Sequence, residues 1–220
     1  MSSIKLKHSG GNSVSLNPPT SAPTSSEVAF KLPNADGSAN QVIKTDGSGN
    51  LGFVAQPTGG LATADQWRYT ATITQSNTHN RLTSTSDWER PDSKGGIASN
   101  PLGTGMTQSG GIFTFPSTGY YWVFFQACAK VDNDSCELFA TIRACDDGSS
   151  FDNVAEYLST IQNQCTPNYN TANVNYLVRV TDVSNVKIQF QVQNSGISVT
   201  WMGETNKNRI SATFLKVGDI

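Results

Sequence analysis

Residues 111–124 read GIFTFPSTGYYWVF, and this stretch decides the fold class of the chain. A short apolar run ends at Pro116, whose ring removes the backbone donor that a continuing strand would need. Gly119 allows a tight turn, because glycine adopts backbone angles that other residues avoid. Aromatic and β-branched residues then follow without interruption, as is typical of a long strand inside a sheet. The stretch therefore predicts a strand, a turn and a second strand that belongs to a core.

Both faces of this second strand are apolar, because side chains alternate between the two faces of a strand. One set is Tyr120, Trp122 and Phe124, and the other is Tyr121, Val123 and Phe125. One face can be buried inside a two-sheet sandwich while the other is buried between subunits. We therefore predict that these six residues, together with Phe214 near the C-terminus, form the core and a subunit interface.

The rest of the chain also has a β pattern, and no stretch has the apolar spacing of an amphipathic helix. Short runs of alternating apolar residues are separated by Gly, Asn, Asp or Ser, as in a sandwich or barrel. We expect an all-β fold whose C-terminal part is a two-sheet antiparallel jelly roll. The expected strands lie near residues 67–75, 111–116, 119–131, 136–145, 150–162, 172–182, 185–194, 196–203 and 207–217.

Residues 111–124 resemble the hallmark of the complement-globular-head and tumour-necrosis-factor-like superfamily. In that superfamily a strand ends in Phe-x-Phe/Val-Pro, turns at x-x-Gly-x-Tyr and enters a long core strand. Residues 209–217, RISATFLKV, resemble the closing strand of the same superfamily. The resemblance covers roughly residues 67–217 and implies a jelly roll that assembles as a homotrimer, with the closing strand near the threefold axis. The calcium ligands of the superfamily have no counterpart that we can assign here.

The N-terminal third predicts an arm that depends on partners. Residues 1–18 read as a small hairpin, in which Ile4 and Leu6 alternate with lysines and Val14 and Leu16 alternate with serines. An isolated two-stranded ribbon is marginal in water, so we expect these four residues to anchor the arm to other chains. Residues 19–60 add a proline-containing linker and short strands with few apolar side chains. Three copies wrapped together would give those strands a shared core.

Residues 32–51, LPNADGSANQVIKTDGSGNL, are similar to segments common in tail-fibre and other virion proteins of tailed bacteriophages. Residues 3–14, SIKLKHSGGNSV, resemble the start of such proteins in phages of marine bacteria, cyanobacteria among them. These resemblances imply that the chain is located in the virion. The jelly roll implies no such role, because one fold serves many functions.

Charge and hydropathy exclude several kinds of partner. Charged residues make up 15% of the 220-residue chain, and its formal net charge is −2. The basic patch of a nucleic-acid-binding protein is missing, so we expect no nucleic-acid partner. No apolar run approaches the roughly 18 residues of a membrane helix, and we expect no membrane insertion. The N-terminus lacks an apolar signal-peptide core, which predicts synthesis in the cytoplasm without ordinary export.

Catalytic chemistry has little support in the sequence. His79, one of two histidines, lies in a polar run with no sign of the positioned base that a Ser-His-Asp triad needs. The pairs Asp87/Glu89 and Asp146/Asp147 could be read as glycosidase carboxylates. Both pairs lie in turn-like settings where aspartate is common. We predict no enzyme, no catalytic residue and no cofactor.

The four cysteines are Cys128, Cys136, Cys145 and Cys165. Zinc ligands usually occur in pairs two to four residues apart, and no pair here is that close, so we predict no metal site. Buried free thiols and disulfides formed after release both fit the sequence. Cys128 and Cys136 could face each other across a hairpin. The run at 132–134 lacks the glycine and terminal glutamate of a calcium loop.

Two aromatic residues are candidates for surface binding. Trp88 and Tyr169 lie in expected loops among Asn and Asp, where an aromatic ring suits contact with a sugar or a protein.

The sequence thus predicts a non-enzymatic, trimeric virion structural protein, exposed as a short fibre or capsid decoration. It would have an anchoring arm (1–18), a stalk and linker (19–60) and a knob (61–220). The expected partners are the chain itself, capsid or tail proteins, and a host-surface glycan or protein. Three alternatives stay open: a receptor-binding tip of the tail, a cellular adhesion module unrelated to virions, and an enzyme acting on cell-surface polysaccharide.

Overall fold

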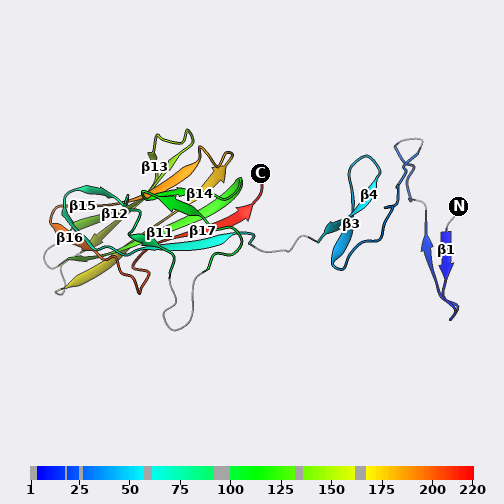
Figure 1. The fold of residues 1–220 in the computed structure, drawn as a ribbon, viewed down its shortest axis with the longest axis horizontal. Helices are drawn as coiled ribbons and strands as arrows, with labels where there is room; N and C mark the ends of the chain where they lie inside the picture. Colours follow the sequence, from blue (N-terminus) through cyan, green and yellow to red (C-terminus); the bar gives the residue numbers. More distant parts are fainter. Residues whose placement is uncertain are drawn as a thin grey trace. The chain divides into compact units, whose positions relative to one another are not determined.

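A computed structural model describes residues 4–17, 19–24, 27–56, 61–91, 100–131, 136–161 and 167–220 (Figure 1). The described residues form strands, turns and irregular segments, and they include no helix. The chain divides into two compact units, Met1–Gly59 and Gly60–Ile220. We call the first unit the arm and the second unit the sandwich.

The described part of the arm contains two separate two-stranded sheets. Strand β1 (Ile4–Lys7) pairs with β2 (Ser13–Leu16), which confirms the hairpin expected in residues 1–18. Strand β3 (Gln41–Thr45) pairs with β4 (Leu51–Ala55), and Asp46 shapes the turn between them. Its Oδ1 accepts hydrogen bonds from the backbone N–H groups of Ser48 (2.8 Å) and Asn50 (3.1 Å). Asp46 is followed by Gly47, and this pair of residues is typical of tight turns.

The sandwich consists of two antiparallel sheets. The first sheet contains β6 (Ile73–Ser76), β16 (Ser198–Trp201), β11 (Gly119–Val131), β17 (Ile210–Gly218), β5 (Ala64–Tyr69) and β8 (Trp88–Glu89) in this order, with β14 (Asn168–Val180) on the other edge of β11. The second sheet contains β13 (Asp152–Ile161), β12 (Cys136–Cys145), β15 (Lys187–Ser195), β10 (Ile112–Thr114) and β9 (Thr107–Ser109), with β7 (His79–Arg81) also paired to β15.

The order of the strands defines a jelly roll. In the first sheet the neighbours are β5-β17-β11-β14, and in the second they are β10-β15-β12-β13. The chain changes sheet at most connections, and its first long strand lies beside its last. This is the double Greek key of a jelly roll, and it confirms the predicted fold class.

Strand β11 lies at the centre of the first sheet, and its side chains alternate between buried and partly exposed along all 13 residues. Gly119 begins it with φ of +142°, and a Cβ there would lie 2.6 Å from the carbonyl oxygen of Gly218. The predicted turn thus needs glycine. The buried side chains of β11, Phe125 among them, pack against the second sheet. The ring of Phe125 stacks on that of Phe190 with centroids 4.6 Å apart.

Two expectations about the strands are wrong. The single strand expected over residues 67–75 is split into β5 and β6, because Thr70 leaves the ladder and donates its N–H to the carbonyl of Asp87. Strands β11 and β12 belong to different sheets, so Cys128 and Cys136 do not face each other across a hairpin. Cys128 is half-buried on the outer side of β11, and Cys136 points into the core.

The described cysteines, Cys128, Cys136 and Cys145, are free thiols. Burial raises the pKa of Cys136 and of Cys145, which keeps both groups protonated. Cys165 and the polar turn at 132–135 lie outside the described residues. Among the residues that the structure describes, no helix is long and apolar enough to cross a membrane.

Candidate functional site

The strongest candidate site is the outer side of the first sheet. Along β11 the outward side chains begin with Tyr120, Trp122 and Phe124, which are 37%, 36% and 41% exposed. The rings of Trp122 and Phe124 lie with centroids 6.0 Å apart. A patch of exposed aromatic side chains often marks a surface that a partner covers. The outer side of β11 is therefore a candidate interface.

Neighbouring strands extend the same apolar surface. Leu177 of β14 and Leu215 of β17 are the direct cross-strand neighbours of Trp122 on its two sides. Leu177 is 45% exposed, and Val217 at the end of β17 is 51% exposed. We call this surface the aromatic face; it comprises Tyr120, Trp122, Phe124, Leu177, Leu215 and Val217.

The surface becomes polar beyond Phe124. Gln66 on β5 donates to the hydroxyl of Thr213 (2.9 Å) and accepts a hydrogen bond from the side-chain amide of Asn208 (2.7 Å). Gln126 donates to the carbonyl of Asn208. These groups line part of a hollow of about 270 Å³ next to Phe124. Amides and hydroxyls both donate and accept, so this region can pair with a copy of itself.

The residues that the sequence assigned to core and interface separate into two groups. Tyr121, Val123, Phe125 and Phe214 are at most 1% exposed and belong to the core of one chain. Only the other set of β11, described above, remains available to a partner. Sequence could not distinguish the two sets, because both are apolar throughout.

Trp88 was expected at the surface, and this prediction is wrong. Trp88 is 4% exposed, and its indole N–H donates to the carbonyl of Leu82 at 2.9 Å. Its ring packs edge-on against Phe113 and Tyr69, with centroids 5.1 and 5.2 Å away. The segment around Trp88 looked like a loop because strand β8 has only two residues, yet its pairing with β5 turns the indole into the core.

The other named residues keep the exposure that their predicted roles need. Tyr169, at the start of β14, is 58% exposed. The four residues proposed for anchoring lie on one side of the hairpin, because Ile4 pairs with Leu16 and Leu6 with Val14. All four are at least 64% exposed. Binding by Tyr169 and anchoring by the hairpin stay predictions.

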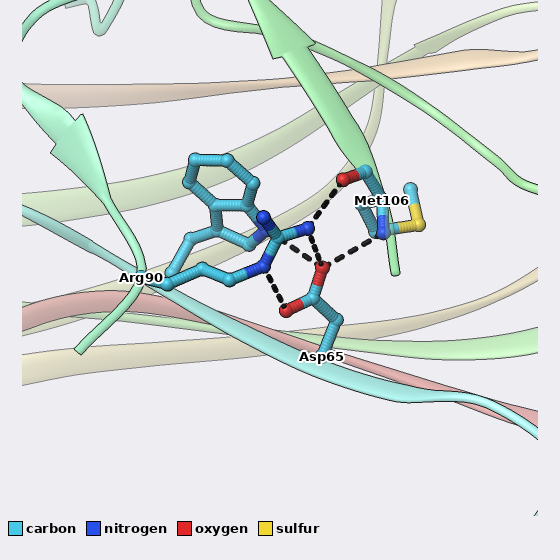
Figure 2. Close-up of polar contacts among 4 residues, drawn as sticks. Asp65, Arg90 and Met106 are labelled. Carbon is cyan, nitrogen blue, oxygen red and sulfur yellow. Dashed lines mark hydrogen bonds and ion pairs between the residues drawn. The ribbon is translucent and has the colours of Figure 1, made fainter. Parts of the chain in front are cut away.

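A buried ion pair in the sandwich had no counterpart in the sequence analysis. The side chain of Asp65 is fully buried. Arg90 forms a bidentate ion pair with it, with Nε–Oδ1 and Nη2–Oδ2 distances of 3.0 and 2.9 Å (Figure 2). The indole N–H of Trp67 (2.9 Å) and the backbone N–H of Met106 (2.7 Å) also donate to Oδ2. A Cβ at Gly105 would lie 2.6 Å from this carboxylate, so the close approach requires glycine.

This ion pair has a structural role. Arg90 also donates to the carbonyl of Met106 (2.7 Å) and lies over the Trp67 ring at 4.4 Å. Residues 90 and 106 are thereby both fastened to strand β5. Neither an isolated Asp65 nor an isolated Arg90 has a sequence pattern that would reveal the pair, because their contact depends on a separation of 25 residues.

Three of the acidic groups considered for catalysis, Asp87, Glu89 and Asp147, have structural partners. Glu89 forms an ion pair with Arg68 at 2.8 Å. Hydrogen bonds from Ser150 and Ser149 hold the pKa of the exposed Asp147 carboxyl well below its usual range. Burial, together with the charge of Asp87, raises the pKa of Tyr69 to about 12. Within the described ranges, no group of three or more His, Cys, Asp or Glu side chains gathers as a metal site.

The outer side of the second sheet holds a polar hollow that the sequence analysis missed. It is lined by His79, Arg81, Thr83, Arg143, Asn153 and Gln191. A signal was present: Arg143 lies in a mainly apolar strand, and glutamines alternate along residues 189–193. Without the topology, however, nothing connects β7 to β12.

Comparisons with known proteins found similar chains among solved structures. No protein-family model and no curated protein matches the sequence. Among solved structures, the Eiger TNF of S. frugiperda is 12% identical with a TM-score of 0.48, covering 71% of this chain and 93% of that chain. Murine APRIL at pH 5.0 is 9% identical with a TM-score of 0.47, covering 70% of this chain and 98% of that chain. The jelly roll assignment rests on the strand order described above.

Proposed function

We propose that this chain is a non-enzymatic structural protein of a bacteriophage particle, assembled as a homotrimer. In this proposal the arm anchors the protein to the particle, and the sandwich is exposed as a short fibre or capsid decoration. The observation that carries the assembly is the aromatic face, which the described residues of one chain leave open.

The composition of this face favours copies of the same chain as its occupants. Its apolar rows offer the aromatic side chains that dominate interface energetics. The adjoining amides of Gln66, Gln126 and Asn208 can serve as donors and acceptors, so one surface can complement its own copy across a symmetry axis. We infer three chains per assembly from the resemblance of residues 111–124 and 209–217 to a superfamily of trimers.

The arm gives independent support for assembly. Its hairpins are exposed on both sides, and large apolar side chains such as Phe30 and Leu32 are 65% and 79% exposed. Covering large apolar side chains with a partner surface lowers the free energy, so their exposure in one chain indicates a partner. Neighbouring copies and a particle protein are the occupants that we propose.

The place of the protein in a virion rests on the sequence of residues 3–14 and 32–51. Mass spectrometry of purified particles from cells that make this chain tests it directly. We expect the protein among the particle components, and its absence would favour a cellular adhesion module. Density at capsid symmetry axes would indicate decoration, whereas density at the tail would indicate the adsorption apparatus.

Assembly is tested by light scattering on the purified chain. We expect the purified protein to have a mass of three times the 23.6 kDa of one chain at micromolar concentration. Leu177→Glu should give monomers, because it places carboxylates in an apolar interface without partners. The far-ultraviolet circular dichroism of the variant should stay unchanged, since Leu177 points away from the core.

A matched control comes from the second sheet. Leu158 of β13 is 49% exposed, close to the 45% of Leu177, and it lies outside the aromatic face. Leu158→Glu should therefore remain trimeric. A monomeric wild-type protein would refute the trimer. If Leu158→Glu dissociated the protein and Leu177→Glu did not, the interface would lie on the second sheet and the proposal would be wrong.

A further inference from the structure

The polar hollow on the second sheet combines two arginines with neutral hydrogen-bonding side chains. Its volume is about 630 Å³, and its lining comes from β7, β12, β13, β15 and Thr83, two residues after β7. Arg81 lies opposite Gln191 on one edge of β15, and Arg143 lies opposite Gln189 on the other edge. The two guanidinium groups therefore approach the same part of the sheet from both sides of β15.

Arg143 is held rigidly. It is 9% exposed, and its Nε donates to Oδ1 of Asn153 at 3.1 Å. Its Nη1 donates to Oε1 of Gln189 (2.8 Å), and its Nη2 donates to the carbonyl of Phe151. Because each Nη carries two hydrogens, one N–H on each remains after these bonds. The guanidinium is thus fixed with two donors left for another acceptor.

The charge of Arg143 is poorly balanced. All three acceptors described for it are neutral oxygens, and a buried charge normally requires an opposite charge. Burial and the nearby Arg81 lower the pKa of Arg143, and Asp152 opposes them with a smaller effect. The carboxylates of β13 are Asp152 and Glu156, and Glu156 accepts a hydrogen bond from Thr141 (3.0 Å). The lining described for the hollow holds two arginines and no carboxylate, so a bound anion would neutralise an excess of positive charge.

The rest of the lining suits hydroxyl groups. The amide nitrogen of Gln191 lies 3.1 Å from Nδ1 of His79. Asn153, Thr83 and Gln191 add further polar atoms, and among the described residues no aliphatic or benzene-ring side chain lines the hollow. A sugar ring offers hydroxyls that match these groups.

We infer that this hollow, which we call the arginine site, binds an acidic saccharide whose carboxylate or sulfate group lies between Arg81 and Arg143. Guanidinium groups bind planar or tetrahedral oxyanions through paired hydrogen bonds, and fixed donors lose little entropy on binding. The arginine site lies on the sheet opposite the aromatic face and does not rest on the assembly or the particle role proposed above.

The test measures binding of the purified protein to three polymers by isothermal titration calorimetry. Polygalacturonate carries carboxylates, dextran sulfate carries sulfates, and dextran is neutral. We expect binding to at least one acidic polymer and none to dextran. The preferred acidic polymer identifies whether carboxylate or sulfate is the natural group.

Two variants locate the site. Arg81→Gln should weaken binding by at least about tenfold, because it removes charge-assisted hydrogen bonds. Arg81 is exposed and has no described structural hydrogen bond from its side chain, so folding should be preserved. Arg143→Lys keeps the charge but removes the paired N–H donors of the guanidinium group. A loss of affinity similar to that of Arg81→Gln would show that binding depends on these paired donors and not on charge alone. Tryptophan fluorescence checks that both variants are folded.

The control is Lys44→Gln, which removes one positive charge from the exposed strand β3. Its affinity should stay within about twofold of the wild-type value. Absence of binding to both acidic polymers would overturn the inference, as would undiminished binding by Arg81→Gln. An equal loss in Lys44→Gln would show general charge attraction instead of a site. Light scattering on the same samples keeps this result separate from trimer formation.

Discussion

The arm and the sandwich are both built from β-strands, yet only the sandwich has a core. Among the described residues, the buried apolar side chains begin at Tyr69 and continue to Phe214. In the arm, apolar residues such as Ile43 and Phe53 are 58% and 39% exposed although they lie in paired strands. Strand pairing alone therefore does not bury side chains.

The difference follows from the number of layers. A two-stranded sheet satisfies its backbone along one edge of each strand, but its faces stay open to water. In the sandwich, two sheets cover each other and their inward side chains meet. Phe190 of the second sheet shows this, because its ring contacts Phe125 of β11 and Phe214 of β17 in the first sheet. A second layer is what the arm lacks within one chain.

The largest expected effect comes from breaking the core between the sheets. Phe190→Ala should lower the free energy of unfolding by about 4 kcal/mol, because it leaves a cavity in a closely packed aromatic cluster. Guanidinium unfolding followed by tryptophan fluorescence measures this, since all four tryptophans lie between residues 67 and 201. Phe190→Leu, which fills more of the space, should lose less. Equal losses in both variants would contradict the cavity explanation.

The next effect concerns the ion pair that fastens residues 90 and 106 to β5. Asp65→Asn should cost about 3 kcal/mol, the lower end for removing one partner of a buried pair, because Arg90 is still 35% exposed to water. The same unfolding measurement applies. Asp36→Asn, the same change in the exposed arm, should have little effect. If Asp65→Asn were equally mild, Asp65 would not be important for stability.

The smallest expected effect comes from the arm. Ile43→Ser should change the free energy of unfolding of the sandwich by less than about 0.5 kcal/mol, as is usual for an exposed position. Ile142→Ser, at a fully buried position of β12, provides the contrast and should be severely destabilising. Protein concentrations must match, because assembly contributes to stability. A loss above 1 kcal/mol in Ile43→Ser would show that Ile43 is covered in solution.

The same comparison shows where sequence reasoning succeeded. The hairpin of β1 and β2 and the long strand β11 depend on neighbouring residues, and both were predicted. Trp88 was misplaced because its burial depends on pairing between β8 and β5, about 20 residues away. The arginine site was missed for the same reason, since Arg81 and Arg143 meet only through β15.

The strands, the tight turns and the all-β class follow from local sequence, because alternation, proline and glycine act within a few residues. Which side of β11 became core depends on tertiary packing. Both sides are apolar, and the choice depends on the position of the second sheet, whose Phe190 covers Phe125 and leaves Trp122 outside. Long-range packing of this kind has no local signal, and it therefore separated the core from the aromatic face.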